Sequence, residues 1–274
     1  MKKSFFILII LGVVVALSGC GGKSNKFASN GIIITSFTVD PTKVYPSSDV
    51  YITADISNVG DAVAKNIRGN IIGLPDHWGE IKTVTINTLD PPEGESEGEA
   101  ATMEWTLKAP SEQGVTLTYP GELVINYDYA TSSETLIRVA NRDWIMGLPD
   151  KQKETEMSKL GEVEAGTESG PIHTSFEVTG NSYSGEATKV TIDIQNVGGG
   201  APLNNEIKGI TIRGLNCPSI QTPLKLMKGE YIQIRDCEIT EIVEQWKNIR
   251  VDIDLDYTYV LRREFDITVS GALG

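Results

Sequence analysis

The chain offers few residues that could carry acid–base or metal chemistry. It has only two histidines, His77 and His173, and neither stands at a Cys/His spacing typical of a zinc site. His77 follows Asp76, but no serine or cysteine nucleophile motif accompanies them, so we interpret His77 as an exposed loop residue. We therefore expect a protein that is not an enzyme, with no catalytic residue, no bound metal and no cofactor.

A row of acidic side chains is the other chemical candidate. Asp252, Asp254 and Asp256 alternate along a predicted strand, where they could offer oxygen ligands to Ca²⁺. Carboxylates two residues apart on one face of an extended strand stand about 7 Å apart, which is too far for all three to hold one ion. We expect a solvated acidic strand face here.

The N-terminal residues have the pattern of an export signal. Two lysines precede an apolar stretch from Phe5 to Leu17. As a helix this stretch would span about 20 Å, short of the roughly 30 Å of a bilayer's hydrocarbon core. We predict a cleaved signal peptide over residues 1–19, with an uncleaved anchor as the alternative.

The signal ends in the tetrad Leu17-Ser18-Gly19-Cys20, which resembles the lipobox of bacterial and archaeal lipoproteins. The resemblance implies that the thiol of Cys20 receives a diacylglycerol and anchors the protein to the membrane on its extracellular side. Simple secretion is the alternative. Residues 20–30 are small and polar, and we expect a lipidated flexible tether.

The remaining cysteines, Cys217 and Cys237, form a potential pair outside the cell, where disulfides persist. A bridge between them would close a loop of about 20 residues and stabilise the fold by roughly 3 kcal/mol in the chain-entropy model. We predict a disulfide, with two buried free thiols as the alternative.

The charge of the chain excludes one class of partner. The formal net charge is −13. An acidic surface repels the phosphate backbone of nucleic acids and anionic lipid headgroups, so membrane attachment would depend on the lipid. We expect a protein or glycan partner at the cell surface and no nucleic acid.

Two similar units follow the leader. Val50–Gly60 (VYITADISNVG) matches Val190–Gly200 (VTIDIQNVGGG), and Leu123–Tyr129 (LVINYDY) matches Val251–Tyr257 (VDIDLDY). Each copy then leads into a last predicted strand. We predict two domains, residues 31–146 and residues 171–274.

Apolar and polar residues alternate in these segments, as they do in strands with one buried face. Turn residues divide the chain into short strands, as an all-β sandwich requires. In the first copy we predict strands near residues 32–39, 50–57, 67–72, 82–87, 101–107, 122–129 and 134–139. In the second copy we expect about seven again, including Val251–Tyr257 and Glu264–Val269.

The run VYITADISNVGDAVAKNI resembles the cell-adhesion-related immunoglobulin-like (CARDB-type) domains of bacterial and archaeal surface proteins. In the second copy, Gly199 to Pro202 depart from the pattern. The resemblance implies an all-β fold of two tandem immunoglobulin-like, seven-stranded antiparallel sandwiches. It also implies a role in adhesion, spacing or display, without catalytic residues.

Two features remain less determined. Residues 147–170 are a linker in which Asp150 could cap a short helix that ends at Gly161, although a disordered linker fits equally well. Trp105 alternates with apolar residues and should be buried. Trp78 and Trp144 flank loops, and they either pack beneath the sandwich or mark a recognition surface.

These observations indicate a non-enzymatic envelope lipoprotein whose two domains bind, space or display an extracellular partner. The alternative is an accessory binding subunit of an extracellular enzyme, a transporter, or a secretion or filament system.

Overall fold

The computed structural model describes residues 31–271, except residues 112–113, 165–169, 181 and 187. Strands account for 59% of it and helices for 9%, which confirms the predicted all-β class. The predicted signal peptide, Cys20 and the tether lie outside the described residues.

The elements follow one another as a long series of strands interrupted by two short α-helices. In chain order they are β1 (Ile32–Asp40), β2 (Lys43–Val44), β3 (Asp49–Asn58), β4 (Ala64–Ile72), the 3-10 helix η2 (Asp76–Trp78), β5 (Val84–Leu89), β6 (Ala100–Lys108), β7 (Leu117–Ala140), α2 (Arg142–Met146), α3 (Asp150–Ser158), β8 (Val163–Glu164), β9 (Ile172–Thr179), β10 (Thr188–Asn196), β11 (Ala201–Pro202), the 3-10 helix η3 (Leu203–Asn205), β12 (Glu206–Ile207), β13 (Gly209–Arg213), β14 (Leu224–Lys225), β15 (Tyr231–Ile239) and β16 (Trp246–Val269).

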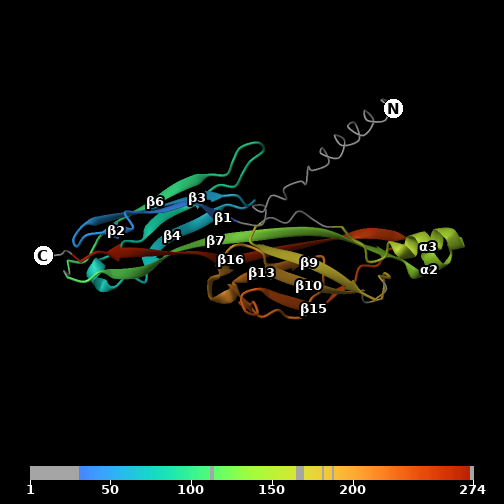
Figure 1. Cartoon of the computed structure of the whole chain (residues 1–274). Helices are drawn as coiled ribbons and strands as arrows, with labels where there is room; N and C mark the ends of the chain where they lie inside the picture. The colour runs from blue at the N-terminus through green and yellow to red at the C-terminus, as the bar shows by residue number, and fades with distance from the viewer. Residues whose placement is uncertain (1–30, 112–113, 165–169, 181, 187, 272–274) are drawn as a thin grey trace, which may run out of the picture.

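One end of the molecule, which we call lobe 1, consists of two facing sheets. β3 lies between β1 and β6 in a three-stranded antiparallel sheet. The opposite sheet contains β5, β4, the first half of β7 and the second half of β16, in that order, and β2 adds a short parallel pairing to the outer edge of β16. Figure 1 shows this lobe at the end where the C-terminus lies.

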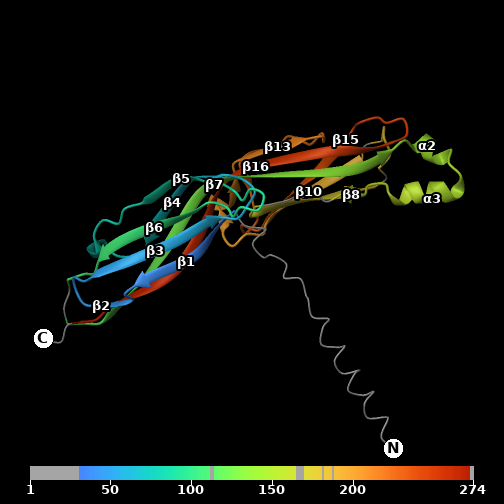
Figure 2. The same ribbon diagram turned by 90° about the horizontal axis from the view of Figure 1, so that it is seen from above.

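The other end, lobe 2, repeats this plan. β10 lies between β9 and β15 in a three-stranded antiparallel sheet. The opposite sheet contains the second half of β7, the first half of β16 and then β13, while β8 pairs with the other edge of β7. The helices α2 and α3 lie at the far end of this lobe (Figures 1 and 2).

The two lobes are joined by continuous strands. β7 and β16 each run for 24 residues and pair antiparallel along their whole length, from Ala140–Trp246 to Leu117–Val269. Each strand therefore begins in one lobe and ends in the other, as Figure 2 shows. Since both lobes share these strands, two separate tandem immunoglobulin-like domains are not confirmed.

This arrangement corrects the predicted strand boundaries. Residues 122–129 and 134–139 belong to the single strand β7, and Val251–Tyr257 and Glu264–Val269 belong to the single strand β16. The chain does not break between these two predicted strands, because residues 130–133 pair with residues 253–256 of β16. Those four residues, Ala-Thr-Ser-Ser, include two serines, which favour turns only weakly, and no glycine, proline, asparagine or aspartate.

The buried side chains follow the predicted alternation. In β3, Val50, Ile52, Ala54 and Ile56 are fully buried, and their neighbours in the strand face outward. Trp105 is buried as predicted. One continuous hydrophobic cluster includes the inward residues of both lobes, so the shared strands carry a shared core.

One helix, α3, lies in the predicted linker, and α2 ends just before the linker begins. α3 begins at Asp150, but Pro149 is the residue before it and no side chain caps the helix, so the predicted capping role of Asp150 is wrong. The helix ends at Ser158 with Lys159 as its C-cap, earlier than the predicted end at Gly161, which has φ of 71°. Glu156 ties α3 to β7 through an ion pair with Arg138 at 2.6 Å.

The shared strands predict that the two lobes unfold together. Ile253→Ala removes a fully buried side chain from the lobe 2 part of β16 and should reduce the free energy of unfolding by about 2–5 kcal/mol. Because β16 continues into lobe 1, a tryptophan probe in lobe 1 (Trp105) and one in lobe 2 (Trp246) should lose their native signals at the same, lower denaturant concentration. Single-tryptophan variants followed by fluorescence during urea unfolding provide the measurement.

Thr106→Ala, at an exposed position in β6, is the control and should change stability by less than about 0.5 kcal/mol. Two separate midpoints, with only lobe 2 destabilised, would contradict the coupling.

Candidate functional site

The cysteines of lobe 2 lie where the sequence predicted a pair. The sulfur atoms of Cys217 and Cys237 are 2.02 Å apart, at disulfide-bonding distance. Cys237 is fully buried in β15, and the adjacent residues Asn216 and Glu238 exchange two backbone hydrogen bonds of 2.8 Å. The bridge therefore fastens the loop after β13 to the edge of the three-stranded sheet.

The two loop tryptophans occupy different environments. Trp78 is 3% exposed and packs edge-on against Tyr119 with ring centroids 5.4 Å apart, so it lies beneath the sandwich and cannot present a recognition surface. Trp144 is half-buried against the small cluster of Ala140, Ile145 and Tyr183 that joins α2 to lobe 2. It keeps some exposed surface at the far end of the lobe.

Two carboxylates of the acidic row of β16, those of Asp252 and Asp254, pair with arginines that could not be connected with them from the sequence. Arg213, on the neighbouring strand β13, contacts Asp254 at 2.7 Å and Asp252 at 3.6 Å. A hydrogen bond from Ser132 and the charge of Arg213 lower the pKa of Asp254 below its ordinary value. Among the described residues, no group of three or more acidic, histidine or cysteine side chains is placed to hold a metal ion.

Four tyrosines meet where the two lobes join, a region that we call the waist. Tyr127 and Tyr129 of β7 pair directly with Tyr259 and Tyr257 of β16, and all four side chains are buried. Their ring centroids lie 5.8 to 6.2 Å apart in successive tilted or edge-on contacts. The core of the waist is thus filled with aromatic rings.

Three of the four tyrosine hydroxyls bind backbone N–H groups, and the fourth, that of Tyr257, lies 2.6 Å from the hydroxyl of Thr131 in β7. Tyr127 accepts a hydrogen bond from Ile32 N–H, and Tyr129 accepts one from Ala62 N–H, both at 3.1 Å. Tyr259 accepts from Gly200 N–H at 3.1 Å and donates to Asn196 Oδ1 at 2.7 Å. The rings fill the core while the hydroxyls position backbone from both lobes.

Burial changes the acidity of these hydroxyls. Loss of solvation disfavours the tyrosinate anion and raises the pKa of Tyr129 and of Tyr259 to about 12. The same cause raises the pKa of Tyr127 and of Tyr257 above the ordinary value. The tyrosines therefore remain neutral hydrogen-bonding groups at physiological pH, as a structural role requires.

The repeated Asn-Val-Gly motif forms equivalent turns on both sides of the waist. Asn58 Nδ2 donates to Ala62 O and Leu89 O, and Asn196 Nδ2 donates to Gly200 O and Gly229 O, at 2.8 to 3.2 Å. The Oδ1 atom of each asparagine accepts from the glycine N–H two residues later. The motif that the sequence repeats is therefore a loop clamp, with its asparagine buried in lobe 1 and partly buried in lobe 2.

On the exposed side of the waist, Asp128 connects the lobes. Its carboxylate accepts hydrogen bonds from Thr258 Oγ1, from Asn66 Nδ2 of lobe 1 and from Lys208 Nζ of lobe 2. Burial acts to raise the pKa of Asp128, but these three hydrogen bonds and the charge of Lys208 outweigh it, so the pKa is lowered. The aspartate therefore stays ionised and bridges the two lobes.

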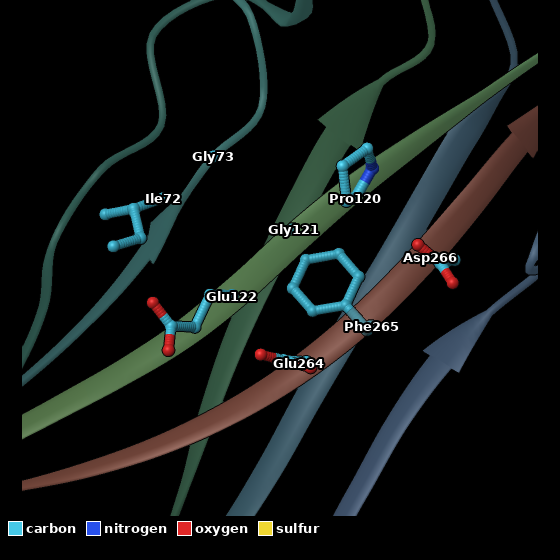
Figure 3. A pocket seen from close by; sticks show the side chains of 8 residues that line it. All are labelled: Ile72, Gly73, Pro120, Gly121, Glu122, Glu264, Phe265 and Asp266. Carbon is cyan, nitrogen blue, oxygen red and sulfur yellow. The ribbon is translucent and has the colours of Figure 1, made fainter.

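A surface hollow of about 540 Å³ lies in lobe 1 beside the end of β4. Figure 3 shows the ring of Phe265 next to Gly121, with three acidic side chains around the opening. Glu122 already pairs with Arg262 at 2.8 Å. The hollow is lined by Ile72, Gly73, Pro120, Gly121, Glu122, Glu264, Phe265 and Asp266. It offers an aromatic ring and negative charge.

Comparison with known proteins does not assign a class to this arrangement. No protein-family model matches the chain, and no curated protein matches it. The fold and the sites define an all-β, sandwich-like protein with one disulfide-linked cysteine pair. None of the helices in the described part of the chain is both long enough and apolar enough to cross a membrane.

The waist provides a stability test. Tyr259→Phe keeps the buried ring but leaves the N–H of Gly200 and the Oδ1 of Asn196 without this hydroxyl, so the free energy of unfolding should fall by about 1–3 kcal/mol. Tyr51→Phe is the matched control, because Tyr51 is 52% exposed, and it should change stability by less than about 0.5 kcal/mol. Urea unfolding of the two variants gives the comparison. Equal stabilities for both would show that the Tyr259 hydroxyl does not hold the loop.

Proposed function

We propose that this protein is a non-enzymatic cell-envelope lipoprotein, anchored by lipid at Cys20, whose two lobes bind, space or display an extracellular partner. The observation that carries the proposal is the lipobox-like tetrad that ends at Cys20 after a charged and apolar leader. The CARDB-type resemblance of the repeated segments favours the same role. The rigid joining of the lobes supports a spacing or display function, because two lobes that share strands keep a fixed separation.

The point at which the tether joins the molecule restricts how it can sit on a membrane. Gly31, the first described residue, lies at the waist, where its carbonyl accepts a hydrogen bond from Val59 N–H at 2.8 Å. A Cβ atom on Gly31 would stand 3.0 Å from the hydroxyl of Tyr127. A lipid at Cys20 would therefore hold the protein by its middle.

The lengths of the long strands and of the tether restrict the orientation of the protein on the membrane. Strands of 24 residues span about 80 Å, so each end of the molecule lies about 40 Å from the waist. The eleven steps from Cys20 to Gly31 reach at most about 40 Å even when fully extended. The molecule would therefore lie along or tilted over the membrane, and it would stand on one end only with the tether drawn out to its full length.

The anchor is tested by Cys20→Ser, produced in a host that processes lipoproteins. The unsubstituted chain should fractionate with membranes and carry a diacylglycerol on Cys20, identified by mass spectrometry of the mature N-terminal peptide. The variant should lose both properties. Cys217→Ser/Cys237→Ser is the control, since it removes two other cysteines and should still be lipidated. An unmodified Cys20 thiol in the membrane fraction would end the proposal.

A further inference from the structure

One edge of lobe 1 contains a gap in its strand pairing. On the side of β16 away from β7, β11 pairs with Tyr259 and Val260, and β2 pairs with Thr268 and Val269. Between them, no described strand pairs with residues 261–267 on this side. We call this stretch the notch, and in Figure 2 it lies on the β1 and β2 side of lobe 1.

The backbone of the notch is oriented to accept a strand. On the same edge, Thr268 N–H donates to Thr42 O, and Asp256 O accepts from Lys208 N–H, both at 2.8 Å. β16 pairs with β7 in an unbroken register, so even-numbered residues direct their N–H and C=O groups away from β7 throughout. Arg262, Glu264 and Asp266 therefore present three donors and three acceptors to the notch.

A hollow beside the notch could hold side chains of an added strand. It measures about 310 Å³ and lies between residues 32–37 of β1 and residues 261–263 of β16. Its walls include apolar side chains of β1 and Leu261. Phe37, which also lines the hollow, contacts Phe265 with tilted rings whose centroids are 5.8 Å apart. The walls also include polar residues, among them Thr35 and Arg263. A strand in the notch would direct every second side chain toward this hollow of mixed lining.

The positive charge of Arg263 at the notch favours a strand with an acidic residue. Arg263 is exposed and forms no ion pair with any described residue, although the chain as a whole carries a net charge of −13. Its side chain belongs to the inward-facing set with Leu261 and Phe265. An added strand would therefore place an acidic residue opposite Arg263, with apolar residues opposite Leu261 and Phe265 on either side.

The shape of the notch excludes a second copy of the same edge. β2 and β11 border the notch at its two ends, and an opposing β16 would bring its own β2 and β11 against them. Sheet pairing needs a spacing of about 4.8 Å between strands, and the bordering strands prevent two such edges from approaching so closely. A single extended segment about seven residues long fits.

The chain's own tether is also a poor match. Residues 21–30 (GGKSNKFASN) contain no acidic residue and only one large apolar residue, Phe27. Three observations point to a ligand: backbone groups that no described strand pairs, an adjoining hollow with apolar residues in its walls, and an arginine with no ion pair among the described residues. We propose that the notch binds an extended peptide segment of a partner protein by strand addition. This segment has the pattern apolar, acidic, apolar at alternate positions. The inference deepens the proposed function, since it gives the partner's chemistry.

The experiment uses a fluorescent heptapeptide, Thr-Val-Thr-Glu-Thr-Val-Thr, and the mature chain in a fluorescence anisotropy titration. The peptide should bind, and replacing its Glu with Lys should weaken binding about fivefold, the effect of one partly exposed ion pair. Arg263→Glu should reverse this preference. N-methylation of alternate peptide amides on the bonding side should abolish binding.

A proline variant tests the backbone hydrogen bonds of the added strand separately from its side-chain contacts. Glu264→Pro removes an N–H that points into the notch and not toward β7, a position at which an edge strand tolerates proline, and it should abolish binding. Glu264→Ala removes the same side chain but keeps the N–H, so it should still bind. Thermal melting should show both variants folded.

Several outcomes would overturn the proposal. They are no binding of the Glu peptide at about 1 mM, equal binding of the Glu and Lys peptides, and unchanged binding after N-methylation or Glu264→Pro. Binding that occurs only after deletion of residues 21–30 would assign the notch to the tether. A concentration-dependent dimer that Glu264→Pro dissolves would assign it to a second copy. None of these results bears on lipidation at Cys20, so the proposed lipid anchor and the proposed peptide site are tested independently.

Discussion

The antiparallel pairing of β7 with β16 is the interaction on which the rest of the structure depends. These two strands form part of the larger sheet in both lobes, and every other strand is added to them or packed over them. In lobe 1 the first half of β7 lies beside the second half of β16, and in lobe 2 the order is reversed. Each half of the chain therefore contributes a strand to the lobe that the other half builds, so neither lobe is complete without the other.

The waist explains how two repeated units become one body. The pair Tyr129–Tyr257 joins matching positions of the two repeats, so the repeats face each other across this pair. Tyrosine rings supply buried apolar area there, and their hydroxyls hold loops from both units. Asp128 adds a polar contact to each lobe on the exposed side. Spacing between the lobes is thus a property of the fold, and it supports the proposed display role.

Much of the fold could be predicted because alternation along a strand is a local property. β1, β3, β4, β5 and β6 lie within a few residues of their predicted positions, and the buried face of β3 follows from its sequence. The connection between strands is not local. Residues 130–133 lack strong turn formers, but only their pairing with residues 253–256 decides that the strand continues. A sequence pattern that repeats faithfully favours two closed units, and it does not reveal that the units exchange strands.

The candidate sites also include features that follow from local sequence and features that depend on strand pairing. The pairing of Cys217 with Cys237 followed from counting cysteines, and the Asn-Val-Gly repeats were visible as a motif. The notch could not be predicted, because it is defined by β2 and β11, two-residue strands with no sequence signal of their own. The roles of the four tyrosines depended on register. Their alternation in YDY and YTY was a signal, but only the pairing of the two segments brings them together.

Hydrogen–deuterium exchange at residues 129–134 tests the shared strands most directly. If β7 is continuous, the amides of this segment that point toward β16 are hydrogen-bonded to it in the middle of the molecule. They should therefore exchange as slowly as the corresponding amides of β7 on either side. Fast exchange confined to residues 129–134, between two protected stretches, would mean that the segment forms an exposed turn. Each half of the chain would then close on itself, and β7 and β16 would not join the two lobes.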